Sequence, residues 1–102
     1  MKRVMVRYKV KADRAGENES YVTRVFEQLK RDQPPGLCYA TFKLDDGVSF
    51  VHIASLEAVD GGNPLRELSA FKAFTAEIRD RCAEPPVTMN LNEVGSYGFF
   101  GA

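Results

Sequence analysis

The only histidine of the chain, His52, is the first candidate for chemistry. An imidazole whose unperturbed pKa lies near 6.5 can accept and return a proton close to neutral pH, so a half-buried histidine suits general acid–base catalysis. His52 lies inside an alternating apolar run, GVSFVHIASLE, over residues 47–57. Tyr8 is expected on the adjacent strand, pointing to the same side. We take His52 and Tyr8 as candidate catalytic residues; a hydrogen-bonded structural histidine and a core tyrosine remain open alternatives.

The other reactive residues form no second centre in the sequence. A single histidine supports neither a Ser-His-Asp arrangement nor a histidine-rich metal site. Cys38 and Cys82 are 44 positions apart, without a CxxC motif or a Cys/His cluster. We expect two reduced, buried thiols, although the spacing alone leaves a disulfide open. Asp45 and Asp46 form an acidic pair that turn chemistry explains. The sequence thus predicts neither a metal nor another cofactor.

Composition is that of an ordinary globular protein. The 102 residues are 44% hydrophobic and 27% charged, which predicts one domain, residues 1–102, with a hydrophobic core. Fourteen basic residues balance fourteen acidic ones without a basic block, which argues against a nucleic-acid partner. The apolar stretches are too short to span a bilayer, and the start, MKRVMVRYKV, alternates like a strand rather than a signal peptide. We therefore expect a cytoplasmic protein without a membrane partner.

Periodicity predicts a strand followed by a helix in the first third of the chain. Residues 3–11 alternate between an apolar and a mixed face. Residues 15–31 carry apolar side chains at helical spacing, and QPPG at 33–36 ends the helix because proline cannot continue it. The apolar stripe of this helix consists of Val22, Val25, Phe26 and Leu29.

A β-hairpin is predicted next, with strands over 37–44 and 48–56. The residues between them, Asp45-Asp46-Gly47, suit a three-residue loop with glycine in the left-handed conformation. The expected pairs are Leu44 with Val48, Phe42 with Phe50, Ala40 with His52, and Cys38 with Ala54. This register places His52 and Phe42 on one face.

A second helical region is predicted from residue 63 to about residue 82. Asn63 can cap it and Pro64 fits the first helical position, while Ser69 can cap a second segment after a short first turn. The apolar stripe consists of Leu68, Phe71, Phe74 and Ile78.

The chain then closes with one more strand. EPP at 84–86 is expected to end the helix, and alternation resumes near Val87. The order βαββαβ with right-handed crossovers predicts an α+β, ferredoxin-like fold. In this fold, two helices cover one face of a four-stranded antiparallel sheet.

The sheet face without helices is also partly apolar. Its expected apolar residues are Met5, Tyr39, Val51 and Ile53. A contiguous apolar surface of this kind is typical of an interface, so we expect a homodimer that pairs these faces. A solvated sheet face covered by long side chains is the alternative.

Two stretches resemble a known family. GGNPLRELSAFKAFTAEIRD at 61–80 resembles the loop and second helix, and NEVGSY at 92–97 the last strand, of small proteins in the antibiotic-biosynthesis monooxygenase-like family of the dimeric α/β-barrel superfamily. The resemblance covers nearly the whole chain, as a pattern of elements and short phrases without a catalytic signature. It implies a homodimeric barrel with a ligand cavity in each subunit, between sheet and helices.

The resemblance also narrows the function. The family includes cofactor-independent oxygenases, haem-degrading enzymes and members without known activity. Haem degradation there uses a histidine on the second helix with tryptophan nearby, whereas this chain has no tryptophan and places its histidine on the third strand. We expect a cofactor-independent monooxygenase, or a related small enzyme, acting on a hydrophobic aromatic or enolisable molecule. The alternative is a non-catalytic binding or structural dimer. The expected cavity-lining residues are Phe42, Phe50, Phe71 and Phe74.

Overall fold

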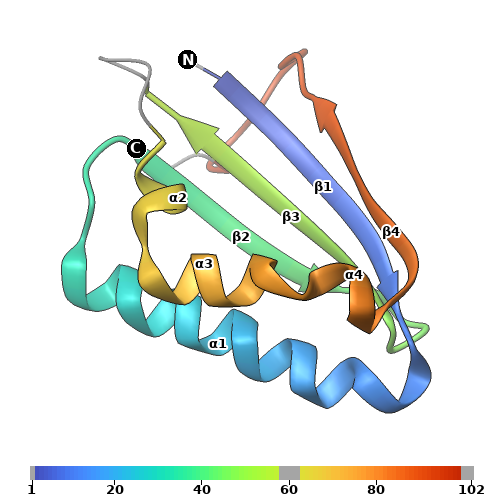
Figure 1. Cartoon of the computed structure of the whole chain (residues 1–102). Helices are drawn as coiled ribbons and strands as arrows, with labels where there is room; N and C mark the ends of the chain where they lie inside the picture. Colours follow the sequence, from blue (N-terminus) through green and yellow to red (C-terminus); the bar gives the residue numbers. More distant parts are fainter. Residues whose placement is uncertain (1, 58–62, 100–102) are drawn as a thin grey trace.

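A computed structural model of the protein describes residues 2–57 and 63–99. The chain forms a four-stranded antiparallel sheet in the order β2-β3-β1-β4, with all helices on one face (Figure 1). The elements are β1 (Lys2–Val10), the 3-10 turn η1 (Ala12–Arg14), α1 (Ala15–Asp32), β2 (Leu37–Lys43), β3 (Ser49–Leu56), α2 (Pro64–Glu67), α3 (Ser69–Ala76), α4 (Ile78–Arg81) and β4 (Cys82–Asn90). The predicted ferredoxin-like arrangement is confirmed.

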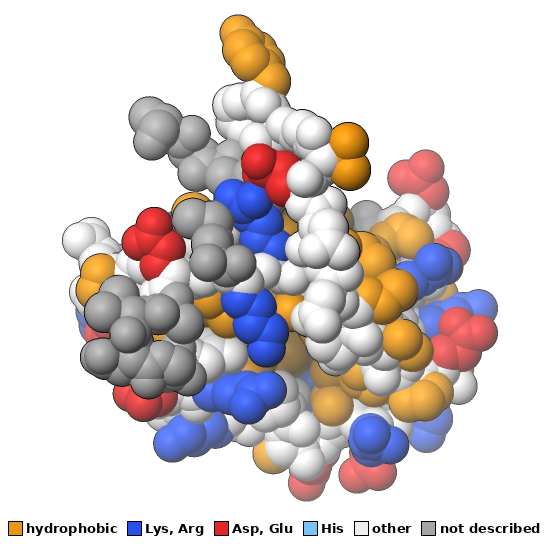
Figure 2. All heavy atoms as spheres, turned by 90° about the horizontal axis from the view of Figure 1, so that it is seen from above, with side chains coloured by type: hydrophobic (Ala, Val, Ile, Leu, Met, Phe, Trp, Pro, Cys, Tyr) orange, Lys and Arg blue, Asp and Glu red, His pale blue; other side chains and the backbone are white. Residues whose placement is uncertain are grey.

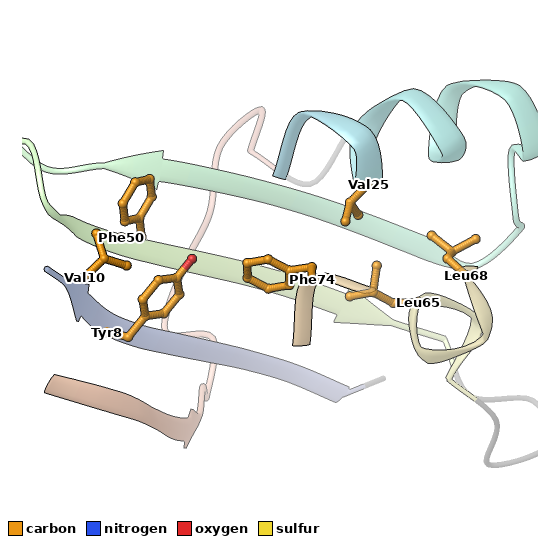
Figure 3. Packing of buried hydrophobic residues seen from close by; sticks show 7 residues of the cluster. All are labelled: Tyr8, Val10, Val25, Phe50, Leu65, Leu68 and Phe74. Atoms are coloured by element: carbon orange, nitrogen blue, oxygen red, sulfur yellow. The ribbon is translucent and has the colours of Figure 1, made fainter. Parts of the chain in front are cut away.

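The hydrophobic core lies between the sheet and the helices, on the face to which β1 turns its valines and Tyr8. Figure 3 shows this layer, in which the Tyr8 ring stands between Phe50 and Phe74. The seven buried residues of the cluster are Tyr8, Val10, Val25, Phe50, Leu65, Leu68 and Phe74. Residues of the two central strands, β1 and β3, and of three helices therefore form the core, as the apolar stripes predicted.

The first helix begins and ends where the sequence predicts. At its C-terminus Gln33 takes a left-handed conformation (φ 45°), and its backbone N–H donates to the Leu29 carbonyl. This bond satisfies one of the free carbonyls that every helix end leaves, and the two prolines that follow prevent a further turn. Gln28, one turn from the end, makes a second connection, because its Oε1 accepts from the Ala70 N–H at 2.8 Å.

The second helical region forms three short helices, and the break that the sequence indicated before Ser69 lies between α2 and α3. Asn63 caps α2 as predicted, since its Oδ1 accepts from the Leu65 N–H at 3.0 Å. Ser69 begins α3 but does not cap it, and Gln28 of α1 supplies that acceptor instead. The loop residues that precede Asn63, at 58–62, lie outside the described residues.

The predicted hairpin register is wrong by one residue. The Leu44 N–H donates to the Ser49 carbonyl, so Leu44 faces Ser49 instead of Val48 and the loop has one more residue. Asp46 stabilises this wider loop, because its carboxylate accepts from the N–H groups of Val48 and Ser49 at 3.0 and 2.8 Å. The Val48 carbonyl in turn accepts from the Val10 N–H of β1 at 2.9 Å.

This shift reverses the face of every β2 side chain, since strand side chains alternate with period two. Thr41, not Ala40, lies opposite His52, and Phe42 lies opposite Val51. Tyr39 therefore faces the helices, although the prediction placed it on the open face. Cys38, which was predicted to be buried under the helices, is exposed on the open side.

The last strand begins five residues earlier than predicted. β4 starts at Cys82, directly after α4, and runs through Pro85 and Pro86 as an edge strand. Proline is tolerated on an edge, where its missing N–H removes no ladder bond to a second neighbour. The register of β4 against β1 shifts between Arg7 and Lys9, which accommodates this segment. Among the described residues, no helix combines the length and apolar character needed to cross a membrane.

Candidate active site

A cavity of about 560 Å³ lies between the sheet and the second helical region. Its volume falls in the range of sites for small organic ligands. The apolar part of its lining consists of Val4, Val6, Ala54, Leu56, Leu65, Phe71, Phe74, Ile78 and Pro86. Tyr8, Tyr39 and His52 also line it, and they place polar atoms on an otherwise hydrophobic wall.

His52 is buried on β3, with 5% of its surface exposed, and both ring nitrogens have protein partners. Its Nε2 lies 2.8 Å from the Tyr8 hydroxyl. Its Nδ1 lies 2.6 Å from the Tyr39 hydroxyl and 2.9 Å from the Thr41 hydroxyl. The register of β2 explains both contacts of Nδ1. Thr41 lies directly opposite His52, and Tyr39 is two residues before Thr41 on the same face of β2.

A chain of hydrogen bonds continues from Tyr8 into the helix layer. Asn18 of α1 donates from Nδ2 to the Tyr8 oxygen at 2.8 Å. Arg81, the last residue of α4, donates from Nε to Oδ1 of Asn18 at 3.2 Å. Residues from four different elements thus meet in one line of hydrogen bonds: Arg81 of α4, Asn18 of α1, Tyr8 of β1 and His52 of β3.

The chemistry of Arg81 sets the direction of this line. A guanidinium has donors but no acceptor, so the amide oxygen of Asn18 must face Arg81 and its NH₂ must face Tyr8. The Tyr8 oxygen therefore accepts, and its single proton goes to Nε2 of His52, the acceptor at hydrogen-bond distance. His52 then carries its own proton on Nδ1 and donates it toward Tyr39 and Thr41.

Burial controls the protonation of these groups. It lowers the pKa of His52 to about 4, so the imidazole is neutral at pH 7. The same desolvation raises the pKa of Tyr39 to about 12 and raises the pKa of Tyr8 well above its usual value. The site in its resting form therefore holds a neutral base with two neutral phenols.

Arg81 is a fully buried cation, with 1% of its surface exposed. Besides Asn18, its Nη2 donates to the Phe74 carbonyl at 2.7 Å, and its guanidinium lies 4.4 Å from the centre of the Tyr21 ring. No carboxylate in residues 2–57 or 63–99 forms an ion pair with it. A buried charge without a counter-ion is costly, and it leaves a positive field inside the protein.

The predicted site residues have different outcomes in the structure. His52 and Tyr8 are brought together, and Phe71 and Phe74 line the cavity. Phe50 lies behind Tyr8 in the core, with ring centres 5.6 Å apart, and is not part of the lining. Phe42 was predicted beside His52 but lies on the open face, 48% exposed, because of the corrected hairpin register.

Four residues of the site were not predicted, and two of them had a signal in the sequence. Asn18 continues the apolar stripe of α1 by one turn before Val22, and Arg81 continues that of the second region three residues after Ile78. A polar residue at a core position is informative. Tyr39 and Thr41 were missed because the register was wrong.

In the described part of the chain, no three His, Cys, Asp or Glu side chains gather closely enough to hold an ion.

A smaller hollow of about 250 Å³ lies on the other side of Tyr39, lined mainly by the end of α1 and the start of β2. Phe26 stacks on Tyr39 there, with ring centres 5.2 Å apart, so Tyr39 separates the two spaces.

Comparison with known proteins identifies the fold. No protein-family model matches the sequence, and no curated protein matches it. Among solved structures, a provisionally assigned antibiotic biosynthesis monooxygenase from Nitrosomonas europaea superposes with a TM-score of 0.76 at 20% identity, covering 93% of this chain and 100% of that one. Another from Caulobacter crescentus gives 0.71 at 24% identity, covering 92% and 90%.

A third structure in this group has a named activity. SnoaB of Streptomyces nogalater, a cofactor-independent oxygenase, superposes with a TM-score of 0.67 at 18% identity, covering 93% of this chain and 94% of that one. At these identities the comparison establishes a shared fold. The chain has the ferredoxin-like fold of the antibiotic biosynthesis monooxygenase-like proteins, as its sequence predicted.

Proposed function

We propose that the protein is a cofactor-independent monooxygenase that oxygenates a hydrophobic aromatic or enolisable molecule in the cavity beside His52. The observation that carries this proposal is the buried His52, whose Nε2 lies 2.8 Å from the Tyr8 hydroxyl in the wall of a mostly apolar cavity. Two further features support it: the fold, which SnoaB shares, and aromatic side chains at the lining that suit a flat substrate.

The chemistry begins with loss of a proton from an activated CH₂ group of the substrate. Tyr8 takes that proton as it passes its own to Nε2 of His52, which leaves an imidazolium and a substrate carbanion or enolate. Its low pKa makes His52 a weak base for a neutral site. The anion formed beside it offsets this cost, because an opposite charge favours the protonated imidazole.

Molecular oxygen is the second reactant, and the substrate supplies the electrons. The carbanion adds O₂ to form a peroxide anion, which takes back the proton held by His52. The hydroperoxide then loses its remaining C–H proton and a hydroxide as water. The balance is R₂CH₂ + O₂ → R₂C=O + H₂O, with one oxygen atom in the product carbonyl and the other in water.

Oxidation of anthrone to anthraquinone tests the proposal. Oxygen uptake and product absorbance are measured with purified protein in the presence of a chelator and without added flavin. We expect turnover above the spontaneous rate, and loss of that excess in His52→Phe. Thr23→Ala, an exposed position on α1 away from the cavity, is the matched control and should retain the rate. Equal rates for the protein and for His52→Phe would reject catalysis at this site.

A non-catalytic binding protein is the second candidate. It is favoured by one observation: hydroxyl groups of the protein already satisfy both nitrogens of His52. A histidine in such a setting can hold the sheet and helix layer together without reacting. In that case anthrone or a similar ligand binds, protects the protein from unfolding and leaves unchanged.

The same proposal includes a homodimer formed through the open sheet face. With the corrected register this face still presents apolar side chains, because Phe42 takes the place of Tyr39. Its apolar residues are Met5, Phe42, Val51, Ile53, Val87 and Met89. Pairing two such faces removes this surface from water, and self-complementary contact between two copies is the commonest symmetry.

A further inference from the structure

The charged side chains that line the cavity in the described part of the chain are all basic. Its charged lining residues are Lys2, Arg66, Lys72 and Arg79, and no Asp or Glu of the described chain lines it. The whole sequence, in contrast, has equal numbers of basic and acidic residues. Figure 2 looks onto this end of the molecule, where Lys and Arg side chains stand beside a hollow with hydrophobic side chains in its depth.

These four cations are also without ion-pair partners among the described residues. Four other basic side chains form ion pairs within the described chain, among them Arg3 with Glu93 at 2.6 Å and Lys43 with Glu19 at 3.1 Å. The cations of the lining come from separate elements, Lys2 from β1, Arg66 from α2, Lys72 from α3 and Arg79 from α4. Positive charge therefore approaches the cavity from several sides, with no described carboxylate to neutralise it.

The buried Arg81 also indicates that the cavity favours negative charge. The buried guanidinium of Arg81 has no described counter-ion, and its hydrogen bonds run through Asn18 to the Tyr8 oxygen at the cavity wall. A buried cation retains its field because little water screens it. The buried Arg81, which reaches the cavity wall through Asn18 and Tyr8, and the basic lining residues thus both favour negative charge in the cavity.

We propose that the cavity selects an organic acid: a flat aromatic molecule that carries a carboxylate or sulfonate at the mouth, beside Lys72 and Arg79. The apolar body then lies against Phe71 and Phe74, and the anionic group pairs with the basic side chains of the lining. This inference extends the proposed function by naming its substrate class, and it is tested by binding rather than turnover. Partly exposed ion pairs each add little, so several cations are needed for selectivity.

Two dyes that differ by one charged group test it. The probes are 8-anilinonaphthalene-1-sulfonate and its neutral counterpart N-phenyl-1-naphthylamine, titrated by dye fluorescence, which the tryptophan-free protein does not obscure. We expect the sulfonate to bind about tenfold more tightly at low salt, with the difference shrinking at high salt. The double variant Lys72→Gln/Arg79→Gln should weaken the sulfonate about tenfold and the neutral dye less than about twofold.

Two control variants complete the design. Lys11→Gln removes an exposed charge away from the cavity and should change neither affinity. Thr88→Phe fills the cavity from edge strand β4 and should weaken both dyes. Equal affinity for the two dyes, an equal loss in Lys11→Gln, or full binding in Thr88→Phe would overturn the inference. If the protein oxidises anthrone but binds both dyes equally well, the inference of charge selectivity fails and the proposed oxygenase activity stands. If it binds the sulfonate selectively but takes up no oxygen with anthrone, the oxygenase proposal fails and the charge selectivity stands.

Discussion

The Nε2 atom of His52 lies 2.8 Å from the hydroxyl oxygen of Tyr8, and Tyr8 is itself held by Asn18 at 2.8 Å. This contact joins β3 to β1 and, through Asn18, to α1. With the direction derived from Arg81, Nε2 is the accepting nitrogen of the imidazole, and Nδ1 carries its proton. The fold therefore determines both the position of the base and the nitrogen that carries its lone pair.

Replacing His52 by phenylalanine should lower stability and abolish turnover. The new ring matches the apolar surroundings, but the buried Tyr8 hydroxyl and the partly buried hydroxyls of Tyr39 and Thr41 lose their histidine partner. We expect the free energy of unfolding, measured by urea denaturation, to fall by about 1–3 kcal/mol, and oxygen uptake to fall by about 100-fold or more. A more stable variant that binds every ligand equally well would identify His52 as a core residue.

Asn18→Asp should reverse the hydrogen-bond line. A carboxylate at this position accepts from both Arg81 and Tyr8, so the Tyr8 oxygen must then accept from His52. The neutral imidazole should change from the Nδ1–H form to the Nε2–H form. Long-range ¹⁵N–¹H correlation spectra report this directly, because the chain has one histidine.

Asn92→Asp is the matched control for that experiment. It makes the same change of charge at an exposed position outside the line. It should leave the spectrum of His52 as it is in the original protein. An Nε2–H form already present before mutation would contradict the direction derived from Arg81.

Stability should decrease in mildly acid solution because of His52. Its pKa is lowered from 6.5 to about 4 by burial, so the unfolded chain takes up the proton first as the pH falls. The contribution of His52 to the free energy of unfolding is fully present above about pH 6.5 and is lost as the pH falls from 6.5 to 4. Below pH 4 this loss does not increase further. The expected loss is roughly 3 kcal/mol, from the size of the pKa change. Urea denaturation across this window, with His52→Gln as the non-titrating control, measures it; equal pH slopes would show that His52 is not the cause.

A charged residue on the open sheet face should prevent formation of the proposed dimer. Val51→Lys places an ammonium among the apolar side chains of β3, where burial in an interface is costly. We expect light scattering at micromolar concentration to give a dimer for the original protein and a monomer for this variant. Thr23→Lys on the helix layer should remain dimeric. A monomeric original protein would reject the pairing.

The C-terminal aromatic residues provide a second test of the interface. Tyr97 is fully exposed, Phe99 is more than half exposed, and Phe100 lies outside the described residues. Such side chains are expected to gain by burial against a second copy. Removing residues 97–102 should weaken association in the same light-scattering experiment; unchanged association would exclude the tail from the contact.

Local pattern was sufficient for the elements and for the helix-covered face of the central strands. Alternation in β1 placed Tyr8 on the core side, and the run around His52 placed the imidazole on the same side. The apolar stripe and the two prolines bounded α1, and Asn63 with Pro64 marked the start of α2. These features depend on neighbours within a few residues, which a sequence displays directly.

The position of β2 was decided by the tertiary structure. Asp46 binds two backbone N–H groups of the loop, and Val48 pairs with Val10 of a different strand, so the loop is wider than its sequence suggested. A shift of one residue moves every side chain to the other face. In the structure Tyr39 therefore lies beside His52, where the predicted register placed Phe42. No local signal in the sequence distinguishes the two registers.

The hydrogen-bond line also exists only in three dimensions. Asn18 and Arg81 are 63 residues apart, and each, taken alone, is an ordinary polar residue on a helix. Packing of α1 and α4 over the same part of the sheet brings them to Tyr8 and His52, where burial removes water and makes each partner necessary. The sequence by itself determined which residue could act as the base. Only the assembled sheet and helices determined its partners, the nitrogen that accepts, and the positive field around it, because these depend on contacts among segments that are distant along the chain.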